Sequence, residues 1–588
     1  MREGGVIEDG GALGVTPHLN PLPVRGEEVA QNPDPLGEYS DIVRTLLRSR
    51  GILDTGEAGR FLKVDFLRDS HDPFLLEGMR VAAERVVRAA KAGEKVVVWS
   101  DYDCDGIPGG VMLAEVLRTL GADVTHYIPH RHDEGYGLNV EGISELAMAG
   151  NGLVVTVDLG STDIEPTAHA KRLGLELIIT DHHTVPEVLP EALAVINPHR
   201  QGSEYPFADL CGAGVAWKLV QAVLVLLREE EKNGGAVCPI AEGQEKWLLD
   251  LVGMATLADM VPLCGENRAL AQYGLLVMRK NRRPGLRALL SLAKLNAEKL
   301  TEDDVGFMIA PRINAASRMD SPHIAARLLG EKDLGKVEDA ARELQALNDE
   351  RKSAVAVIVK EARHKLREHG RGAESIVVMG STDWRPGVLG LVANKLMETD
   401  NVPVFLWGRH GETDLKGSCR SDGTVHVVEM MRAASGVLAG FGGHEMAGGF
   451  SLKEERAHEL AAALEAAYRQ TRREVGEETV FIDLELSLAD ADRALREISQ
   501  LAPFGVGNPK PLFAFRGALI SQLKTFGKHH EHLELMLSDG SRRLSAIAFF
   551  SAPEAFQKAP QEGIQCDVIG HLEAGWNGRA RVRLVEVL

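Results

Sequence analysis

The first part of the chain repeats one pattern of hydrophobic and polar positions, in which a short apolar run ends at a polar residue and a helical pattern follows. Four such runs lie between residues 95 and 198, each with the length and β-branched composition of a buried strand: KVVVWSD, LVVTVD, LELIITD and LAVINP. Helical patterns such as GGVMLAEVLRTLG lie between them. Strands that alternate with helices predict a doubly wound parallel sheet, in which ligands bind at the carboxyl ends of the strands.

The pattern changes twice farther along the chain. From about Ala341 a helical pattern, ARELQALNDERKSAVAVIVKEARHKLREHG, exceeds the usual length of a globular helix and predicts a helix that joins two lobes. A second α/β segment follows, and after about Glu477 short alternating strands predict an all-β barrel of the OB type. We therefore expect a disordered tail or misplaced start (1–38), a parallel-sheet domain with N-terminal and helical extensions (39–340), a linker helix (341–370), a smaller α/β domain (371–474) and an OB-type domain (475–588).

Length and apolar content fit a multidomain protein without a membrane segment. A chain of 588 residues exceeds the size of one core and predicts about three or four domains. The longest apolar stretch, VAWKLVQAVLVLL, contains Lys218 and Gln221 and is shorter than the ~20 residues that span a bilayer. The first residues lack the basic and apolar regions of a signal peptide. The six cysteines include no C-x-x-C pair, which indicates a reducing cytoplasm.

The formal net charge of −19 argues at first sight against a nucleic-acid partner, because phosphate binding needs clustered Lys and Arg. However, an enzyme that gathers acidic metal ligands and threads a single strand through a narrow channel needs only a local basic lining. The charge therefore lowers the expectation of a nucleic-acid partner without excluding it.

Carboxylates gather at the predicted strand ends. DYDCDG supplies three within five residues, two further apolar runs end in an acid, TDHH adds two histidines, and LADMVPL adds one more acid. The acids are Asp101, Asp103, Asp105, Asp158, Asp181 and Asp259. A single aspartate after a strand is usually a turn or N-cap residue, but capping needs only one oxygen. Hard oxygen ligands with one or two imidazoles suit Mg²⁺ or Mn²⁺, whereas a structural zinc site would bring thiolates.

Ten motifs run in one order along residues 40–588. Four contain the acids and histidines just described: DYDCDG, VTVDLG, TDHH and LADMVPL. The others are YIPHRHDEGYGL, APRINAASRM, WRPGVLGLVANKL, KGSCRS, GFGGHEMAGGF and LAPFGVGNPKPLFAF. Together these motifs resemble those of the DHH/DHHA1 phosphoesterases, and specifically the bacterial RecJ family of single-stranded-DNA-specific exonucleases. The resemblance implies a parallel-sheet DHH domain, a DHHA1 domain and a nucleic-acid-binding OB domain.

The resemblance also implies which residues hold two divalent cations, Mn²⁺ or Mg²⁺. The implied ligands are Asp103, Asp105, Asp158, His182 and Asp259. Asp158 is expected to bridge the ions, and Asp101 to bind one ion or to support a ligand. His183 is expected to contact the scissile phosphate, with Asp181 orienting the neighbouring imidazole; a satisfied buried histidine is the alternative for His183. Two ions about 3.5 to 4 Å apart would activate a water and stabilise the leaving oxygen.

A 5′-terminal exonuclease also has to bind the end of the strand, and guanidinium groups hold a terminal phosphate well. The resemblance nominates Arg131, Arg318, Ser418 and Arg420 for this role, although a single arginine is more often a surface side chain. The glycines of FGGHEMAGG free backbone N–H groups to approach phosphate, and His444 offers a further polar contact. A plain cluster of turns is the alternative for this segment.

Several positions depart from the usual wording of the family's motifs. DLGST stands where DTGI is usual, and the other departures are Pro108 after DGI, Ser317 in NAASR, Arg385 in WRPG and Cys419 in KGSCRS. None removes an implied metal ligand. We expect the departures to change the substrate channel and the turnover rate more than the type of reaction, with Cys419 narrowing the end-binding pocket.

Three functions from different classes follow. The first is a 5′→3′ exonuclease that releases 5′-mononucleotides from single-stranded DNA in recombination and repair. For this function the resemblance implies a cytoplasmic monomer that works with single-stranded-DNA-binding protein and a RecQ-type helicase. The second is a phosphoesterase for oligoribonucleotides or cyclic dinucleotides, against which the predicted C-terminal barrel argues. The third is a catalytically silent RecJ-like scaffold, against which the complete ligand set argues.

Overall fold

The computed structural model describes residues 18–19 and 34–588, apart from 132, 369–375, 410–414, 474–480, 528–529, 531 and 576–577. The expected disordered tail, residues 1–38, lies almost wholly outside the described residues. The chain forms two compact units, one of Phe66–Val475 and one that combines Met1–Asp65 with Gly476–Leu588. Among the described residues, the helices are all too short or too polar to cross a membrane.

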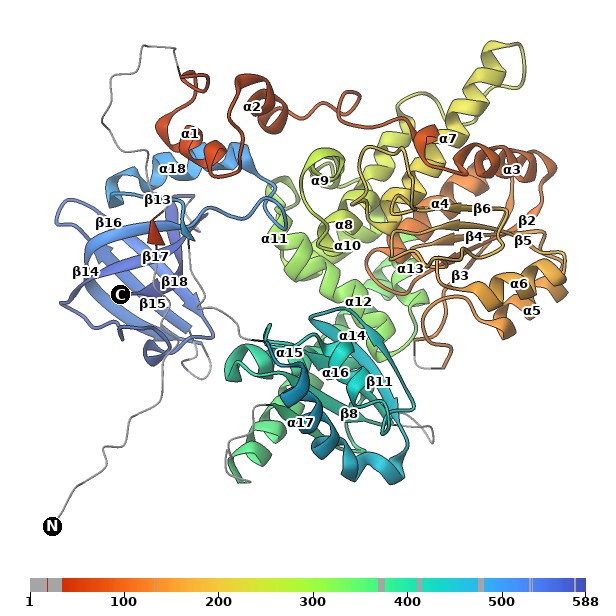
Figure 1. Ribbon diagram of the computed structural model, residues 1–588. Coiled ribbons are helices and arrows are strands. Elements are labelled where there is room, and N and C mark those ends of the chain that lie inside the picture. The colour runs from red at the N-terminus through yellow and green to blue at the C-terminus, as the bar shows by residue number, and fades with distance from the viewer. Residues whose placement is uncertain are drawn as a thin grey trace. The chain divides into compact units, whose positions relative to one another are not determined.

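The larger unit contains a parallel sheet with helices on both faces (Figure 1). The strands, in spatial order, are β3 (Asp123–Tyr127), β2 (Lys95–Ser100), β4 (Leu153–Val157), β5 (Glu176–Thr180) and β6 (Ala194–Ile196). Alternate residues of β2 face opposite sides, so that Val96 and Val98 enter one core and Val97 and Trp99 the other. The helices of the two faces are α3 (Met79–Ala92), α4 (Gly106–Thr119) and α7 (Gly212–Lys232) on the first, and α5 (Val140–Met148) and α6 (Ile164–Arg172) on the second. The predicted doubly wound sheet is therefore confirmed.

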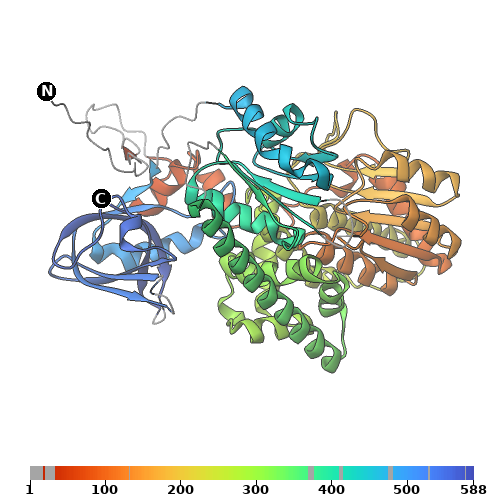
Figure 2. The same ribbon diagram turned by 90° about the horizontal axis from the view of Figure 1, so that it is seen from below.

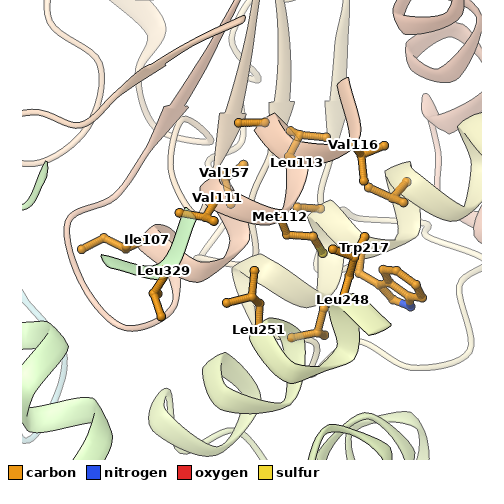
Figure 3. Close-up of a cluster of buried hydrophobic side chains, with 14 of the residues drawn as sticks. Ile107, Val111, Met112, Leu113, Val116, Val157, Trp217, Leu248, Leu251 and Leu329 are labelled. Atoms are coloured by element: carbon orange, nitrogen blue, oxygen red, sulfur yellow. The ribbon is translucent and has the colours of Figure 1, made fainter. Parts of the chain in front are cut away.

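Helix α4 is buried at the centre of this domain and carries the DYDCDG loop at its N-terminus. Figure 3 shows its side chains meeting those of several neighbouring elements, and the labelled residues are Ile107, Val111, Met112, Leu113 and Val116 of α4, with Val157, Trp217, Leu248, Leu251 and Leu329 around them. Close packing from several sides leaves α4 little freedom to move. The acidic loop that precedes it is therefore held in a fixed position.

The rest of this domain is helical, and the long helix α14 leads out of it. The helices are η1 (Pro73–Leu75), η2 (Gln244–Leu248), α8 (Leu249–Ala258), α9 (Gly265–Arg279), α10 (Pro284–Ala293), η3 (Ala297–Lys299), α11 (Glu302–Asp304), the π-helical η4 (Val305–Ile309), α12 (Ala310–Met319), α13 (His323–Gly330) and α14 (Leu334–Glu368). Figure 2 shows α14 as one long continuous helix. Its first half buries Val337 and Leu344 in the core of the sheet domain, and its second half buries Val355 and Ile358 in the next domain. The predicted linker helix is confirmed.

The second domain of the larger unit is built on a mixed sheet in which β7 and β8 are parallel and the other neighbours antiparallel. The strands, in spatial order, are β10 (Gly440–Gly443), β11 (Ala447–Leu452), β9 (Leu415–Arg420), β8 (Val404–Gly408) and β7 (Val377–Gly380). The helices are α15 (Pro386–Asp400), α16 (Val427–Ala433), η5 (Glu454–Glu459) and α17 (Leu460–Thr471). Leu415 and Cys419 of β9 point into the core of this domain.

The smaller unit contains a β-barrel, closed because β14 pairs with both β15 and β17. Its strands are β13 (Leu484–Glu485), β14 (Phe513–Phe526), β15 (His532–Ser538), β16 (Arg543–Phe549), β17 (Gln565–Ala574) and β18 (Ala580–Val587), and the short β1 (His18–Leu19) pairs with β12 (Phe481–Ile482). The helices beside the barrel are η6 (Leu488–Asp490), α18 (Ala491–Ile498), η7 (Ser499–Leu501) and η8 (Pro553–Ala555). The predicted OB-type domain is confirmed.

Residues 39–65 belong with this barrel rather than with the parallel-sheet domain to which the sequence analysis assigned them. They form α1 (Asp41–Arg48) and α2 (Thr55–Leu62). Ile42 and Leu46 of α1 enter the same core as Ile498 of α18 and the inner residues of the barrel. The apolar stripe of α1 predicts an amphipathic helix, but such a stripe does not specify the surface on which it packs.

Candidate functional site

The carboxyl ends of β2, β4 and β5 meet at one edge of the parallel sheet. Asp101, Asp158 and Asp181 each follow directly after one of these strands. Their backbone N–H groups continue the sheet, since each donates to a carbonyl of the neighbouring strand at 3.0 to 3.1 Å. The fold therefore brings the three acids side by side, as expected for a doubly wound sheet.

The imidazole of His182 lies among the acids. Its Nε2 atom is 3.2 Å from Asp158 Oδ1 and 3.7 Å from both Asp105 Oδ2 and Asp259 Oδ2. Asp259 reaches this position from the C-terminal end of α8, which is distant from the strand ends in sequence but adjacent to them in space. Residues from separate motifs thus converge on one imidazole.

Asp158 belongs to more than one group of potential ligands. Oxygens of Asp101, Asp103 and Asp158 lie within 4.8 Å of one another, and so do ligand atoms of Asp158, His182 and His183. A carboxylate shared by two groups occupies the position expected of a ligand that bridges two ions. Asp103 also accepts hydrogen bonds through Oδ1 from the N–H groups of two residues that follow it, at 2.8 and 3.1 Å, which fixes the acidic loop.

Within the described part of the chain, three buried atoms of this cluster have no hydrogen-bond partner: Asp101 Oδ1, Asp158 Oδ1 and His182 Nε2. Burial, and then repulsion from neighbouring acids, raises the pKa of Asp158 well above its usual range and the pKa of Asp259 to about 9. Burial lowers the pKa of His182, which favours the neutral imidazole that binds metal ions. Unpartnered buried oxygens are costly unless a cation neutralises them. A donor set of carboxylates with an imidazole fits Mn²⁺ or Mg²⁺.

The backbone around Asp158 and Asp105 is specialised. Asp158 has a φ of +67°, a strained left-handed conformation that is often found at functional sites. Gly212, at the start of α7, packs against it, and a Cβ at this position would collide with the Cβ of Asp158. The carboxylate of Asp105 accepts hydrogen bonds from the N–H groups of Gly212 at 2.6 Å and Ala213 at 2.8 Å, where the helix dipole favours negative charge.

Asp181 holds the two histidines rather than joining the cluster. Its Oδ1 accepts from the N–H of His182 at 2.8 Å and lies 2.8 Å from His183 Nδ1, and its Oδ2 accepts from the N–H of Ser161 at 2.9 Å. Burial alone would raise the pKa of Asp181, but the hydrogen bond to His183 and its charge lower it below its usual value. For His183, burial alone would lower the pKa of the imidazole. The hydrogen bond to Asp181 and the charge of that carboxylate outweigh burial, so the pKa of His183 is raised. The side chain that Asp181 orients is therefore that of His183.

A cavity of ≈ 730 Å³ is lined by residues from both domains of the larger unit. Four of the predicted phosphate-binding residues line it, namely Arg131, Arg318, Ser418 and Arg420. Arg318 comes from α12, and Ser418 and Arg420 come from one face of β9. His444 is exposed in the turn between β10 and β11 and is not among the lining residues.

The arginines of this pocket are held by carbonyl and hydroxyl groups. Arg420 Nη1 donates to the carbonyl of Cys419 at 2.7 Å and lies 3.3 Å from Ser418 Oγ, while Arg318 Nη1 donates to the carbonyl of Gly387 at 3.1 Å. Burial, and then repulsion from Arg131, lowers the pKa of Arg318 to about 9, and burial lowers the pKa of Arg420. Clustered, partly desolvated guanidinium groups would be stabilised by a bound anion.

Family models match three successive segments of the chain: the DHH family, N-terminal domain at residues 95–256, the DHHA1 domain at 373–470 and the RecJ OB domain at 482–586. The single-stranded-DNA-specific exonuclease RecJ of Escherichia coli (strain K12) is 32% identical over 554 residues, which cover 90% of this chain and 92% of that protein. The chain belongs to the RecJ family. RecJ of Bacillus subtilis (strain 168) is 34% identical over 548 residues, which cover 92% of this chain and 67% of that protein.

Solved RecJ structures share the fold of the chain. The crystal structure of RecJ in complex with Mn²⁺ from Thermus thermophilus matches with a TM-score of 0.76 and 28% identity, and covers 94% of this chain and 77% of that one. The Mg²⁺ complex of the same protein matches with a TM-score of 0.71 and 27% identity, and covers 94% and 76% of the two chains. The two units described above therefore correspond to the architecture of a RecJ protein.

The residues at which the chain departs from the RecJ motifs are not among those that line the pocket. Cys419 is fully buried in the core behind β9, on the opposite face from Ser418 and Arg420, so the expectation that it narrows the pocket is wrong. Arg385 is exposed and its Nη1 pairs with Glu350 at 2.6 Å. Pro108 occupies the first turn of α4, where a missing N–H group is tolerated. Ser317 is buried in α12, and its hydroxyl lies 3.4 Å from the carbonyl of Asn314.

Three residues inside the RecJ motifs take part in the site although the sequence analysis did not nominate them. Asn314 Oδ1 accepts from the N–H of Cys104 at 2.8 Å and so ties α12 to the acidic loop. Lys416 lines the pocket two residues before Ser418, and the period of two along β9 is the signal that would have identified it. Tyr136 lines the same pocket, and its hydroxyl donates to the carbonyl of Asp158 in the cluster of acids and histidines, called the metal cluster below. The sequence EGYG around Tyr136 does not indicate a role in the site, because the contacts of its side chain depend on the shape of a turn.

Proposed function

We propose that the chain is a metal-dependent exonuclease that degrades single-stranded DNA in the 5′→3′ direction and releases 5′-mononucleotides, in DNA recombination and repair. The observation that carries the proposal is a cluster of carboxylates and one imidazole with unpartnered buried atoms, together with a nearby pocket lined by three arginines. The curated relatives that are 32% and 34% identical to the chain are named single-stranded-DNA-specific exonucleases.

The proposed cofactor is a pair of Mn²⁺ or Mg²⁺ ions, and the RecJ structures in complex with each metal support this choice. The proposed ligands are Asp103, Asp105, Asp158, His182 and Asp259, with Asp158 as the bridge. When bound, such ions activate a water and stabilise the leaving oxygen of an in-line displacement. Asp101 completes the cluster, since its unpartnered Oδ1 belongs to the same group of oxygens as Asp103 and Asp158.

His183 is proposed to hold the scissile phosphate. Its Nδ1 is engaged with Asp181, which leaves Nε2 available for a phosphate oxygen. Because Asp181 raises the pKa of His183, the protonated imidazole donates from Nε2 and adds a positive charge beside the phosphate. The carboxylate of Asp181 thus acts through His183 and does not contact the substrate.

The arginine pocket is proposed to set the direction of degradation. Arg131, Arg318, Ser418 and Arg420 surround a space that fits a 5′-terminal phosphate, so that the next phosphodiester faces the metal cluster. Guanidinium groups bind phosphate through paired hydrogen bonds, which fix orientation as well as position. His444, exposed on the hairpin of β10 and β11, is proposed to contact the strand outside this pocket.

The outer face of the barrel is proposed to bind the single strand through its bases. His532 of β15 pairs with Phe549 of β16, with ring centroids 5.2 Å apart, and Phe526 of β14 lies 5.0 Å from His532. Arg583 of β18 stands over the ring of Phe549 at 4.2 Å, and Phe550 is 83% exposed. Aromatic faces with an arginine stack unpaired bases, and the second and third strands of OB barrels bind oligonucleotides.

Family membership also supports the finer expectations about cellular context. We propose that the chain acts in the cytoplasm as a monomer, and that single-stranded-DNA-binding protein and a RecQ-type helicase present the strand to it. The barrel argues against a substrate of only two or three nucleotides, which needs no separate strand-binding surface. The metal cluster, with carboxylates and His182 all in place, argues against a catalytically silent scaffold.

End-labelled strands test the proposal. With Mn²⁺ or Mg²⁺, a 5′-labelled single strand should release labelled mononucleotide from the first moments, whereas a 3′-labelled strand should shorten through a ladder of products. Both reactions should stop with a chelator, and a duplex with blunt ends should be resistant. Early release of the 3′ label, or hydrolysis confined to dinucleotides, would contradict the proposal. The matched control is Asp158→Asn, which keeps the size of the side chain and removes its charge.

A further inference from the structure

Tyr136 connects the phosphate pocket with the metal cluster. Its hydroxyl donates to the carbonyl of Asp158 at 3.1 Å and lies 3.2 Å from His183 Nδ1. Its ring meets that of His183 edge to face, with centroids 5.7 Å apart, and also lines the ≈ 730 Å³ cavity. The hydroxyl therefore touches the backbone of one proposed ligand and the side chain of the proposed phosphate contact, without occupying a ligand position.

A row of contacts leads from the pocket to Tyr136. The guanidinium of Arg131 stands over the ring of Tyr102 at 4.6 Å. The ring of Tyr102 meets that of Tyr136 edge to face, with centroids 6.5 Å apart. Tyr136 in turn meets His183. The buried ring of Tyr102 thus joins Arg131 to Tyr136, which is itself 48% exposed.

The turn around Tyr136 is fixed by specific hydrogen bonds. Gly135 and Gly137 have φ values of +84° and +90°, which only glycine adopts without strain. Asp163 Oδ2 accepts from the N–H of Leu138 at 2.7 Å, directly after the turn. Before it, the carboxylate of Glu134 accepts from the N–H of His130 at 2.6 Å. The backbone thus holds Tyr136 against the cluster from both sides.

We propose that Tyr136 is a positioning residue that couples the binding of a terminal phosphate at Arg131 to the orientation of His183. This inference rests on the proposed function. A phosphate bound by Arg131 holds that guanidinium against Tyr102, and Tyr102 holds the ring of Tyr136. The hydroxyl of Tyr136 then keeps His183 turned towards the scissile phosphate. The hydroxyl of Tyr136 also fixes the carbonyl of Asp158, whose backbone is strained. A strand with a 5′-phosphate is therefore hydrolysed faster once bound, and not only bound more tightly.

The variant Tyr136→Phe tests this role, because it removes the hydroxyl and leaves the ring. On a 5′-phosphorylated single strand, kcat should fall by about ten- to a hundredfold with KM changed by less than about twofold, the effect of losing hydrogen bonds to a charged site. The ratio of kcat between 5′-phosphate and 5′-hydroxyl strands should move towards one. The matched control is Tyr273→Phe, which removes a hydroxyl that accepts from the N–H of Phe66 elsewhere in the same unit. Tyr273→Phe should keep the wild-type kcat and the wild-type ratio of kcat between 5′-phosphate and 5′-hydroxyl strands.

Two further measurements distinguish a positioning role of Tyr136 from a role in metal binding or strand binding. Calorimetric titration with Mn²⁺ should give the same stoichiometry for Tyr136→Phe and wild type, and loss of a metal site would overturn the inference. An unchanged kcat, or a raised KM with kcat unchanged, would also overturn it. The simple diester bis(p-nitrophenyl) phosphate tests positioning without DNA, and kcat on it should fall in Tyr136→Phe. If the wild type hydrolyses this ester but not single strands, the proposed function fails while the positioning role stands.

Discussion

The acids of the cluster stand on short side chains at the ends of buried strands, in the loop before α4 and at the end of α8. The arginines of the pocket reach in on long side chains from a loop, a helix and a strand of two domains. Backbone hydrogen bonds fix the acids, as the two N–H groups of α7 that hold Asp105 show. Arg318 and Arg420 donate to carbonyl and hydroxyl groups, and Arg131 stands over the ring of Tyr102. Under the proposed function, this difference would tie the reaction to the rigid backbone and the choice of strand end to side chains that can adjust.

The largest effect is expected from the rigid region. Asp158→Ala should lower kcat by at least about a thousandfold, because a carboxylate shared by two groups of ligands cannot be replaced without losing both. Binding of a single strand should change little, since the arginine pocket and the barrel are untouched. Nucleotide release and fluorescence anisotropy measure the two quantities.

Asp158→Asn sharpens this test. Asparagine tolerates the φ of +67° at this position, so the variant separates the charge of the carboxylate from the conformation of the backbone. Both variants should be equally inactive if the charge matters. More than about a tenth of the wild-type rate in either variant would contradict the assignment of Asp158 as a bridging ligand.

The adjustable region should give a smaller and more selective effect. Arg420→Ala should lower kcat/KM on 5′-phosphorylated strands by about ten- to a hundredfold, since hydrogen bonds to a charged group contribute ~1.5 to 3 kcal/mol. Strands with a 5′-hydroxyl should be affected much less. The control is Arg385→Ala, which removes an exposed arginine paired with Glu350 outside the pocket. Equal losses on both kinds of strand would mean that Arg420 binds the chain generally.

A third test compares both regions with the barrel. Phe549→Ala should weaken binding of a long single strand by about tenfold, because stacking on one base contributes ~1 to 3 kcal/mol. Cleavage of an oligonucleotide of a few bases should be unaffected. Phe481→Ala serves as the control, since Phe481 is 62% exposed on β12 of the same unit and is not one of the rings clustered on the barrel face. Unchanged binding in Phe549→Ala would place the strand on another surface of the barrel.

The smallest effect concerns stability at the border between the two regions. Burial raises the pKa of Asp163 to about 6, against an unfolded value near ~3.9. The folded state therefore holds the proton more tightly, and this contribution to stability is present below about pH 4 and is lost as the pH rises to about 6. Asp163→Asn, which keeps an oxygen for the N–H of Leu138, should nearly match the wild type at pH 4 and exceed it by about 2 kcal/mol at pH 7. Urea unfolding at several pH values measures this difference, and a constant difference would contradict it.

The sequence predicts the metal cluster better than the pocket for a physical reason. Asp101, Asp158 and Asp181 each follow a β-branched run, and parallel strands necessarily bring such ends together. Arg131 and Arg420 meet only because one domain is held against another, and no local pattern of apolar and polar residues encodes that contact. Their roles could be predicted only from the motifs of the family.

Three further cases show what local patterns can and cannot predict. The stripe of α1 predicts a helix correctly but not its place on the barrel, because apolar faces are interchangeable partners. For Cys419, by contrast, the alternation of side chains along β9 already places it opposite Ser418 and Arg420, so the strand pattern was sufficient and the motif comparison misled. Tyr136 depends on a turn with two glycines at positive φ, whose shape is not readable from the surrounding sequence.

The helix α14 acts as a spacer of fixed length between the two domains that line the arginine pocket. It is a single helix of 35 residues, anchored in the first domain by Leu344 and in the second by Val355. Each residue of a helix adds about 1.5 Å of length and about 100° of rotation. Inserting one residue between these anchors would therefore turn Ser418 and Arg420 away from Arg131, while most substitutions on the exposed side would leave the pocket intact. We therefore expect the number of residues between the two anchors to vary less among active versions of the protein than the identities of those residues.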